Sequence, residues 1–263
     1  MMELNGRPVT AEELRALAFA NYGHFTSMRV EGMGVRGLAL HLERLQGDCR
    51  ILHGVDLDLD RVRHLARRAA AAAPSPVMIR VTVFDPELDV ARPAADAHPE
   101  ILVSTRPAPP DGPPPLTLGT ADYERDIPEI KHTGLFGTVM QRRFAQLTGS
   151  DDVLFTDSVG RILEGATWNI GFVRDGRVVW PGSGCLNGVT MRLLNGVMER
   201  AGIPHTTAEV DLDDIHRVSS AFVTNAAAGP RPVRSIDGVE LDADAPILTT
   251  LRREYAAIPG DPL

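Results

Sequence analysis

The chain has 263 residues, 43% of them hydrophobic, which is enough for one large domain or two modest ones with a buried core. Its formal net charge of -8 at pH 7 is spread along the sequence, which argues against nucleic acid or anionic membrane as a partner and favours a small-molecule ligand. Cys49 and Cys185 are far apart and lack a CxxC spacing, so we expect neither a disulfide framework nor a metal site.

Three features of the sequence favour a cytoplasmic location. The two cysteines would be free thiols, as is usual in a reducing compartment. The first residues, MMELNGRPVT, lack the apolar region of a secretory signal. No apolar run reaches the length that a membrane-spanning helix needs.

The residues before position 107 favour three helices followed by a strand. Thr10 and Glu13 have the T-x-x-E spacing of a capping box, which opens a helix. The apolar spacing of HLERLQGDCRIL, from His41, predicts a second helix, and the alanine and arginine run after Asp58 predicts a third. Apolar residues then alternate with others over 77–84, as in a strand with two distinct faces. We therefore expect this half to be α/β.

The stretch PAPPDGPPP at 107–115 separates two halves of different character. Its prolines cannot continue a helix and supply too few amide donors for a central strand, so it should be an extended, stiff connector. The expected organisation is a smaller N-terminal α/β domain at 1–106, this connector, and a larger C-terminal domain at 116–263 that carries Lys131.

The second half favours antiparallel strands and one amphipathic helix. VLFTD and RILEG flank a turn at 158–160, and IGFV and RVVW flank a turn at 174–176, both in the pattern of a hairpin. GVTMRLLNGVMERAG predicts a helix that ends at Gly202. A strand over 221–224 then leads into the small-residue loop NAAAG.

Four residues are candidates for chemistry by type and position. Lys131 lies between an expected strand end and a glycine-containing turn, and Glu164 lies in a hairpin strand, where a buried acid would need a partner. Thr190 opens the amphipathic helix, whose free amides and dipole favour an anion. Arg44 lies on the helix that includes His41. Each of these residues alone also fits an ordinary surface or capping role.

Five motifs in order resemble class IV aminotransferases, a family that includes branched-chain and D-amino acid transaminases and aminodeoxychorismate lyases. The resemblance extends over 22–238. It implies a two-domain, α+β variety of α/β fold (fold type IV, like D-amino acid aminotransferase), the cofactor pyridoxal 5'-phosphate (PLP), and a homodimer. The motifs are HLERL at 41–45, IPEIKH at 127–132, DDVLFTDSVGRILEGATWNIGFV at 151–173, LNGVTM at 186–191 and FVTNAAAGPRPV at 222–233.

The resemblance also assigns roles to individual residues. Lys131 would hold PLP as an imine, the internal aldimine, and then transfer a proton between the substrate and the cofactor, while Glu164 would pair with the pyridine nitrogen. The remaining cofactor contacts would come from Arg44, Val189, Thr190, Asn225 and Ala226. The resemblance places Phe25, Thr26 and Arg29 on the strand that lines the substrate pocket. His24 and Arg106 are further candidates for contact with substrate.

Departures from the family pattern leave the reaction open. Phe136 stands where branched-chain enzymes have a tyrosine hydroxyl, and the turn beginning at Thr224 has Asn225 where many transaminases have glycine. Trp168 is unusual beside the glutamate motif and fits a core aromatic equally well, and His132 should face away from Lys131 if both lie on a strand. The favoured function is amino transfer between an amino acid and a 2-keto acid. The alternatives are a lyase that forms 4-aminobenzoate and pyruvate from aminodeoxychorismate, and a catalytically silent ligand-binding relative.

Overall fold

The computed structural model describes residues 1–263, and the chain divides into two compact units. The boundary near Pro109 falls inside the segment expected to be a connector. The first unit consists of Met1–Pro109, Ile130–Gly134 and Pro259–Leu263, and the second unit consists of Pro110–Glu129 and Leu135–Ile258.

The short segment Ile130–Gly134 belongs to the first unit, whereas the sequence analysis assigned Lys131 to the larger C-terminal domain. Backbone hydrogen bonds explain the difference. The amide of Phe25 donates to the carbonyl of Lys131 at 2.9 Å, and the amide of Thr133 donates to the carbonyl of Gly23 at 2.9 Å. This pairing joins segments that are far apart in the chain, so local sequence patterns do not reveal it.

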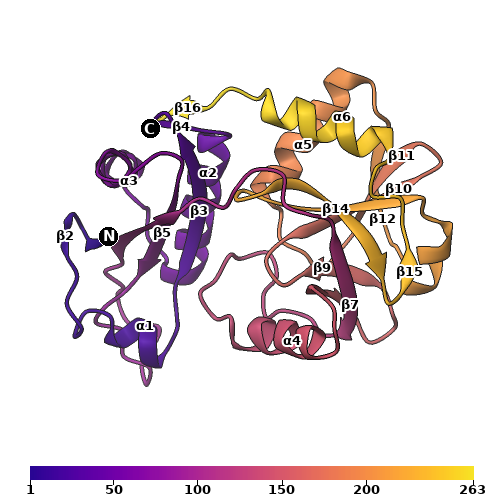
Figure 1. The fold of residues 1–263 in the computed structure, drawn as a ribbon. Helices are drawn as coiled ribbons and strands as arrows, with labels where there is room; N and C mark the ends of the chain where they lie inside the picture. Colours follow the sequence, from indigo (N-terminus) through magenta and orange to yellow (C-terminus); the bar gives the residue numbers. More distant parts are fainter. The chain divides into compact units, whose positions relative to one another are not determined.

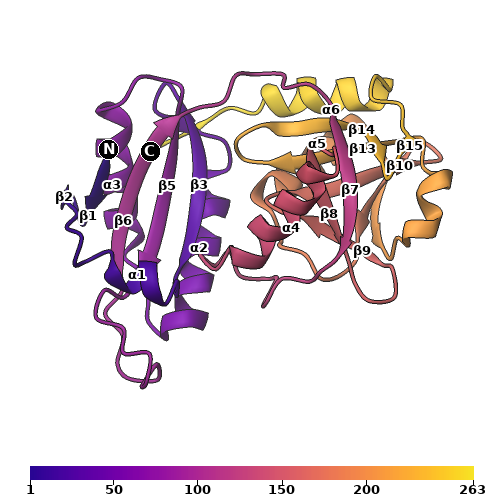
Figure 2. The ribbon, with the colours of Figure 1, turned by 60° about the horizontal axis from the view of Figure 1, so that its bottom comes forward.

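The first unit is built on a seven-stranded sheet in the order β16-β4-β3-β5-β6-β1-β2. Its long strands β3, β5 and β6 are antiparallel neighbours, and they lie side by side in Figure 2. The strand expected over 77–84 is present as β5. The strands are β1 Met2–Leu4, β2 Arg7–Pro8, β3 His24–Glu31, β4 Gly34–Val35, β5 Val77–Phe84, β6 Glu100–Pro107 and β16 Asp261–Pro262.

Two helices, α2 (Leu38–His53) and α3 (Leu59–Ala71), bury apolar side chains against one face of this sheet. The side chain of Asp58 accepts a hydrogen bond from the amide of Arg61 at 2.9 Å and caps α3 at its first turn. Both helices are those that the sequence predicts. The helix expected to include His41 begins slightly earlier, because its first turn packs Leu38 into the core.

The first helix, α1, is shorter than the capping box suggested. Thr10 and Glu13 do exchange the reciprocal hydrogen bonds of a capping box, with Glu13 Oε2 accepting from the Thr10 amide at 2.8 Å. The α-helix itself covers only Arg15–Phe19 and buries no side chain. A helix this short lacks an apolar face that would extend it by tertiary packing.

The second unit contains a sheet with the path β12-β11-β10-β13-β14-β7-β8-β9, and β15 pairs with β14. Both hairpins predicted from the sequence are present, as the antiparallel pairs β8·β9 and β10·β11. Three pairs, β7·β8, β7·β14 and β11·β12, are parallel. The strands are β7 Leu116–Asp122, β8 Asp152–Thr156, β9 Ile162–Gly165, β10 Asn169–Arg174, β11 Arg177–Pro181, β12 His205–Ala208, β13 Ser220–Asn225, β14 Gly229–Ile236 and β15 Val239–Glu240.

Both faces of this sheet are buried at its centre. Along β13, Ala221 and Val223 join one apolar cluster, while Phe222 joins the opposite cluster together with α5 and α6. Helices α5 and α6 are side by side in Figure 1. Gly202 ends α5 in the left-handed conformation with φ of 65°, as the sequence predicts. The helices are α4 Phe136–Leu147, α5 Val189–Ala201, the 3-10 turn η1 Leu212–Arg217 and α6 Pro246–Ala256.

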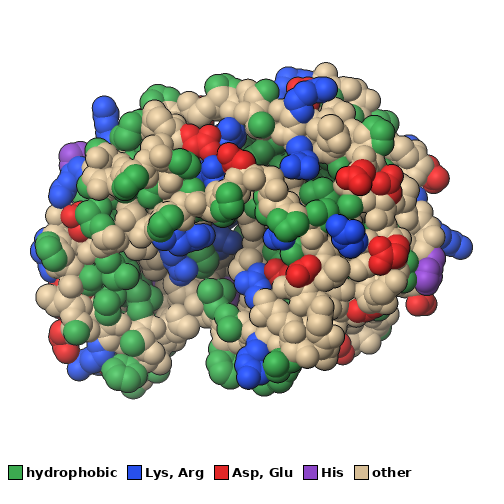
Figure 3. Space-filling model, in the orientation of Figure 1, with side chains coloured by type: hydrophobic (Ala, Val, Ile, Leu, Met, Phe, Trp, Pro, Cys, Tyr) green, Lys and Arg blue, Asp and Glu red, His purple; other side chains and the backbone are tan.

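Charged side chains of both signs lie on the face shown in Figure 3. None of the helices combines the length and the apolar character that crossing a membrane requires.

Candidate active site

Lys131 is held by its backbone between a strand and a helix of the first unit. Its carbonyl accepts the amide of Phe25 in β3 at 2.9 Å, and its amide donates to Oδ2 of Asp48 in α2 at 3.2 Å. Its Nζ lies 5.0 Å from the centre of the Phe25 ring. Lys131 is also the only lysine in the sequence, whose remaining basic side chains, apart from histidines, are arginines. The chain therefore fixes one unique primary side-chain amine at a defined place.

The buried side of α2 carries polar residues at helical spacing. His41, Arg44 and Asp48 share this side, and the first and last of them are 2% and 5% exposed. Thr26 of β3 hydrogen-bonds both to His41 Nδ1 at 2.7 Å and to Arg44 Nη2 at 2.8 Å. Burial, reinforced by the charges of Arg44 and Lys131, lowers the pKa of His41 to about 3, so its ring is neutral. The structure thus brings together two residues expected at the site, Thr26 and Arg44, and adds Asp48, which the sequence analysis did not single out.

The residues expected from β3 divide between the two faces of its sheet. His24 and Thr26 are fully buried on the α2 side, while Phe25 and Arg29 are on the opposite side. Neither ring nitrogen of His24 has a hydrogen-bond partner, and burial is the main reason that its pKa falls to about 3. His132 is not within a regular strand. It forms an isolated bridge with His24.

The sheet face that carries Phe25 also carries three arginines. Arg29 of β3 and Arg106 of β6 are in register with the same residue of β5, and Arg80 of β5 is two positions further along. The guanidinium of Arg80 lies 3.6 Å above the centre of the Phe25 ring. Burial, followed by the charge of Arg106, lowers the pKa of Arg80. Arg29 is already engaged, because its Nε donates to Glu31 Oε1 at 2.5 Å and its Nη1 donates to the carbonyl of Pro109 at 2.7 Å. Arg80 and Arg106 are therefore the guanidinium groups of this face that suit a carboxylate ligand. Arg80 was missed, although the strand alternation over 77–84 places it on this face.

In the second unit, Glu164 is a buried acid with a charged partner. Its side chain is 6% exposed, and Oε1 accepts from Nε of Arg125 at 2.7 Å. Oε2 accepts from the amide of Leu186 at 3.1 Å, and Arg125 also donates to the carbonyl of Pro128 at 2.5 Å. Burial and the charge of Glu164 raise the pKa of neighbouring Cys185 to about 11. The sequence indicated that Glu164 would need a partner but gave no sign that it would be Arg125.

The start of α5 has the features of an anion site. Gly188 precedes the helix in an extended conformation, and no side chain caps it. Val189 and Thr190 are the first two helical residues, whose amides have no partner within the helix. Thr190 is 3% exposed, and its Oγ1 has no hydrogen-bond partner, which is also true of the buried Thr224 Oγ1. Buried hydroxyl donors beside free amides fit a phosphate group.

Asn225 and Ala226 lie in the turn that ends β13. Oδ1 of Asn225 accepts the amides of Ala227 and Ala228, both at 3.0 Å, so this side chain caps its own turn. Phe136, the departure from branched-chain enzymes, is the first residue of α4, with 82% of its surface exposed.

Known proteins of one family are similar to this chain in sequence. The model of the family described as amino-transferase class IV matches residues 23–236. A branched-chain-amino-acid aminotransferase of Pseudomonas aeruginosa is 28% identical over 110 residues, which are 41% of this chain and 36% of that protein. A putative branched-chain-amino-acid aminotransferase of Methanocaldococcus jannaschii is 26% identical over 257 residues, which are 89% of this chain and 87% of that protein. The chain thus matches just over a third of the length of the Pseudomonas protein.

Solved structures share the fold. A branched-chain aminotransferase of Thermoproteus uzoniensis with norvaline superposes with a TM-score of 0.87 at 21% identity, over 97% of this chain and 93% of that one. The PLP-bound form of a hypothetical aminotransferase from Mycobacterium tuberculosis gives 0.83 at 20% identity, over 98% of both chains. A putative 4-amino-4-deoxychorismate lyase of Legionella pneumophila gives 0.78 at 19% identity, over 89% and 90%. The two-sheet, fold type IV architecture implied by the resemblance is therefore confirmed, and the chain belongs to the amino-transferase class IV family.

Proposed function

We propose that this chain is a PLP-dependent aminotransferase that moves an amino group between an amino acid and a 2-keto acid. Class IV aminotransferases are PLP enzymes, and the Mycobacterium tuberculosis relative has a PLP-bound form. The observation that carries the proposal is the single lysine. A chain whose other cationic side chains are arginines keeps one primary side-chain amine, and both backbone polar groups of that residue are hydrogen-bonded. An amine is the group that PLP needs, and a guanidinium cannot replace it.

The other residues expected at the cofactor have matching chemistry. Glu164 supplies a buried carboxylate for the pyridine nitrogen, and Arg125 pairs with that carboxylate. The amides of Val189 and Thr190, the hydroxyl of Thr190 and the guanidinium of Arg44 supply donors for the phosphate. We assign Asn225 and Ala226 to the same phosphate side through the backbone of their turn.

Within this proposal, Lys131 has two tasks. PLP, when bound, withdraws electrons from the substrate carbon so that a proton can leave it. The neutral amine of Lys131 would accept that proton at Nζ. It would then donate the proton to the cofactor carbon. The backbone bonds to Phe25 and Asp48 limit where Nζ can reach. On the sheet face that carries Phe25, Arg80 and Arg106 would bind a substrate carboxylate, with the Phe25 ring beneath Arg80.

The lysine assignment can be tested by mapping the covalent link. PLP is added to the purified protein and the imine is fixed with borohydride, after which the protein is digested with a protease that cleaves after lysine. Free protein should be cut once, after Lys131, whereas the fixed adduct should resist cleavage and carry one added pyridoxyl phosphate by mass. Lys131→Arg, which keeps the charge, should show no absorbance of a covalent link. A link in that variant, or one found only at the N-terminal amine, would refute the assignment.

A lyase reaction is the second candidate, because the turn at Asn225 resembles in sequence the asparagine-bearing turn of the lyases. The same lysine would then form 4-aminobenzoate and pyruvate from aminodeoxychorismate. The two reactions separate in one assay, because only amino transfer yields a new amino acid from an added keto acid. A protein that gains no imine absorbance with PLP would instead be a silent relative.

We further propose that the chain forms a homodimer through the outer face of α4. Helix α4 buries only Thr138 and Ala145, and its outer face is apolar and exposed. A face of this kind is expected to be covered by another protein surface. Changing both Phe136 and Phe144 to serine should convert a dimer to a monomer in analytical ultracentrifugation. The exposed apolar residues of α4 are Phe136, Val139, Met140, Phe144 and Leu147.

A further inference from the structure

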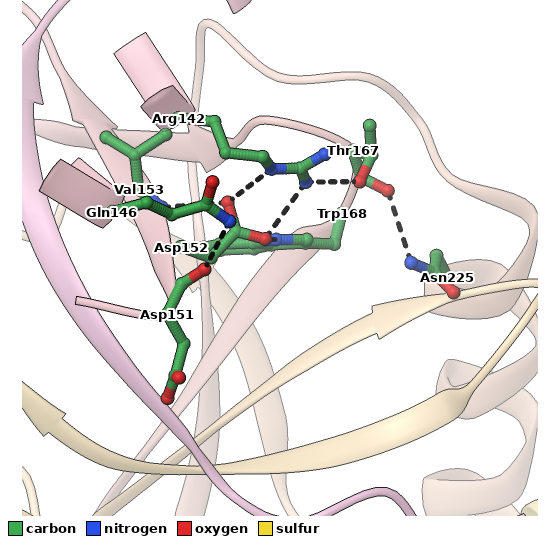
Figure 4. A network of polar contacts seen from close by, with 8 residues as sticks. All are labelled: Arg142, Gln146, Asp151, Asp152, Val153, Thr167, Trp168 and Asn225. Atoms are coloured by element: carbon green, nitrogen blue, oxygen red, sulfur yellow. Dashed lines mark hydrogen bonds and ion pairs between the residues drawn. The ribbon is translucent and has the colours of Figure 1, made fainter. Parts of the chain in front are cut away.

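A partly buried polar network connects α4, β8 and the turn after β9 in the second unit (Figure 4). Its centre is Asp152, which is 8% exposed and accepts four hydrogen bonds. Nε and Nη2 of Arg142 donate at 2.9 Å each, the indole Nε1 of Trp168 donates at 2.9 Å, and the amide of Val153 donates at 2.8 Å. The carboxylate is thereby fully coordinated, and the indole is fixed in one orientation.

The indole of Trp168 covers the turn that follows Glu164. The amide of Gly165 donates to the carbonyl of Trp168 at 3.0 Å and closes the turn. The ring lies so close to Gly165 that a Cβ added there would be 2.2 Å from a ring carbon. The turn over 165–168 is therefore closed by its backbone and covered by a ring whose position depends on Asp152.

The same network extends to a second turn, which begins at Asn225. Nη2 of Arg142 donates to Oγ1 of Thr167 at 2.8 Å, and the carbonyl of Thr167 accepts from Nδ2 of Asn225 at 3.4 Å (Figure 4). Oδ1 of Asn225 holds the amides of the following turn. Both turns adjoin residues assigned above to the cofactor, since one follows Glu164 and the other contains Ala226.

Packing alone does not account for this arrangement. A largely buried ion pair stabilises a fold little better than apolar residues of the same volume, because both charges lose their hydration. Hydrogen bonds to a charged carboxylate are directional, however, and they fix a turn more narrowly than apolar contacts do. We therefore expect the network to fix the geometry of the two turns more than it raises the free energy of unfolding.

We propose that Arg142, Asp152 and Trp168 are positioning residues that set the two turns for binding PLP. The inference rests on the proposed function, and it assigns none of the three residues to contact with substrate. The inference predicts that removing one bond of the network weakens PLP binding. The effect should exceed that of removing a comparable buried bond outside the network.

The test uses a pair of matched tryptophan variants. Trp168→Phe removes the indole N–H bond to Asp152 together with the ring atoms Cζ2 and Cη2 that lie over Gly165, so both links made by the indole are lost. Trp180→Phe is the control, because Trp180 is 1% exposed and its Nε1 donates to Asn195 at 2.9 Å, a bond outside the network. PLP is titrated into each apo protein and followed by absorbance and by the circular dichroism of the bound cofactor. Trp168→Phe should raise the Kd for PLP about tenfold, whereas Trp180→Phe should leave it within about twofold.

The outcomes separate the inference from the function on which it rests. If wild-type protein binds PLP and both variants bind it equally well, the network is structural only and the inference fails alone. If wild-type protein does not bind PLP, the proposed function fails and the inference fails with it. Should Trp168→Phe not fold, Arg142→Lys keeps the charge but loses the bidentate pair and the bond to Thr167, and it should show the same rise in Kd. An unchanged Kd in that variant would overturn the inference.

Discussion

Removal of Arg125 should show how Glu164 is held. Arg125→Met keeps an unbranched stem but removes the bond from Arg125 Nε to Glu164 Oε1, while the Leu186 amide still donates to Oε2. Both partner side chains are less than one-tenth exposed, at 8% and 6%, so solvent cannot replace the lost cation. Breaking a buried pair on one side costs about 3–5 kcal/mol. A native domain is stable by about 5–15 kcal/mol, so the variant should remain folded but be clearly weakened.

The assay is urea unfolding of the apo protein at pH 7, followed by the fluorescence of Trp168 and Trp180, which are in the same unit as the pair. Arg161→Met is the control, since Arg161 pairs with acids at the exposed surface and its loss should change little. A loss below about 1 kcal/mol for Arg125→Met at pH 7 would contradict the buried, charged pair described above.

Three further variants or conditions give definite expectations. Gly165→Ala should destabilise the second unit by about 1–3 kcal/mol in urea unfolding, because the added methyl group overlaps the Trp168 ring, and an unchanged midpoint would contradict that contact. Asp48→Ala leaves the amide of Lys131 without its acceptor and should lower kcat more than it raises KM, while equal binding and turnover in both proteins would argue against this role. His41 has a pKa of about 3 in the folded chain, below its ordinary value, so its contribution to stability is complete above about pH 6.5 and is lost as the pH falls toward 3. His41→Gln should flatten this part of the pH profile of unfolding, and a profile of unchanged slope would contradict the burial of a neutral ring.

The features that the sequence predicts correctly depend on residues close together in the chain. Asp58 caps the third helix through an amide three residues on, and Gly202 ends α5 by its own backbone conformation. The strand over 77–84 follows from alternation alone. These signals act over a few residues, so they survive in the folded protein whatever surrounds them.

The features that the sequence analysis missed depend on distant pairs. Arg125 is 39 positions from Glu164, and Asp48 is 83 positions from Lys131, so no local pattern connects either pair. The same reason explains why the segment around Lys131 was assigned to the larger domain. Backbone pairing with β3 decides to which unit this segment belongs, and that pairing is known only from the three-dimensional structure.

The hydrogen bonds of Asn225 bear on whether the turn that begins there can distinguish a lyase from a transaminase. The sequence connects Asn225 with the lyases, which would matter most if its amide touched the substrate. Its Oδ1 accepts two amides of its own turn, and its Nδ2 donates to Thr167. These bonds engage both ends of the side chain within the second unit, so an asparagine here serves turn geometry whichever reaction follows. Discrimination between amino transfer and lyase chemistry must then come from other groups. The arginines on the Phe25 face would bind a carboxylate in either reaction, so carboxylate binding alone does not separate the two.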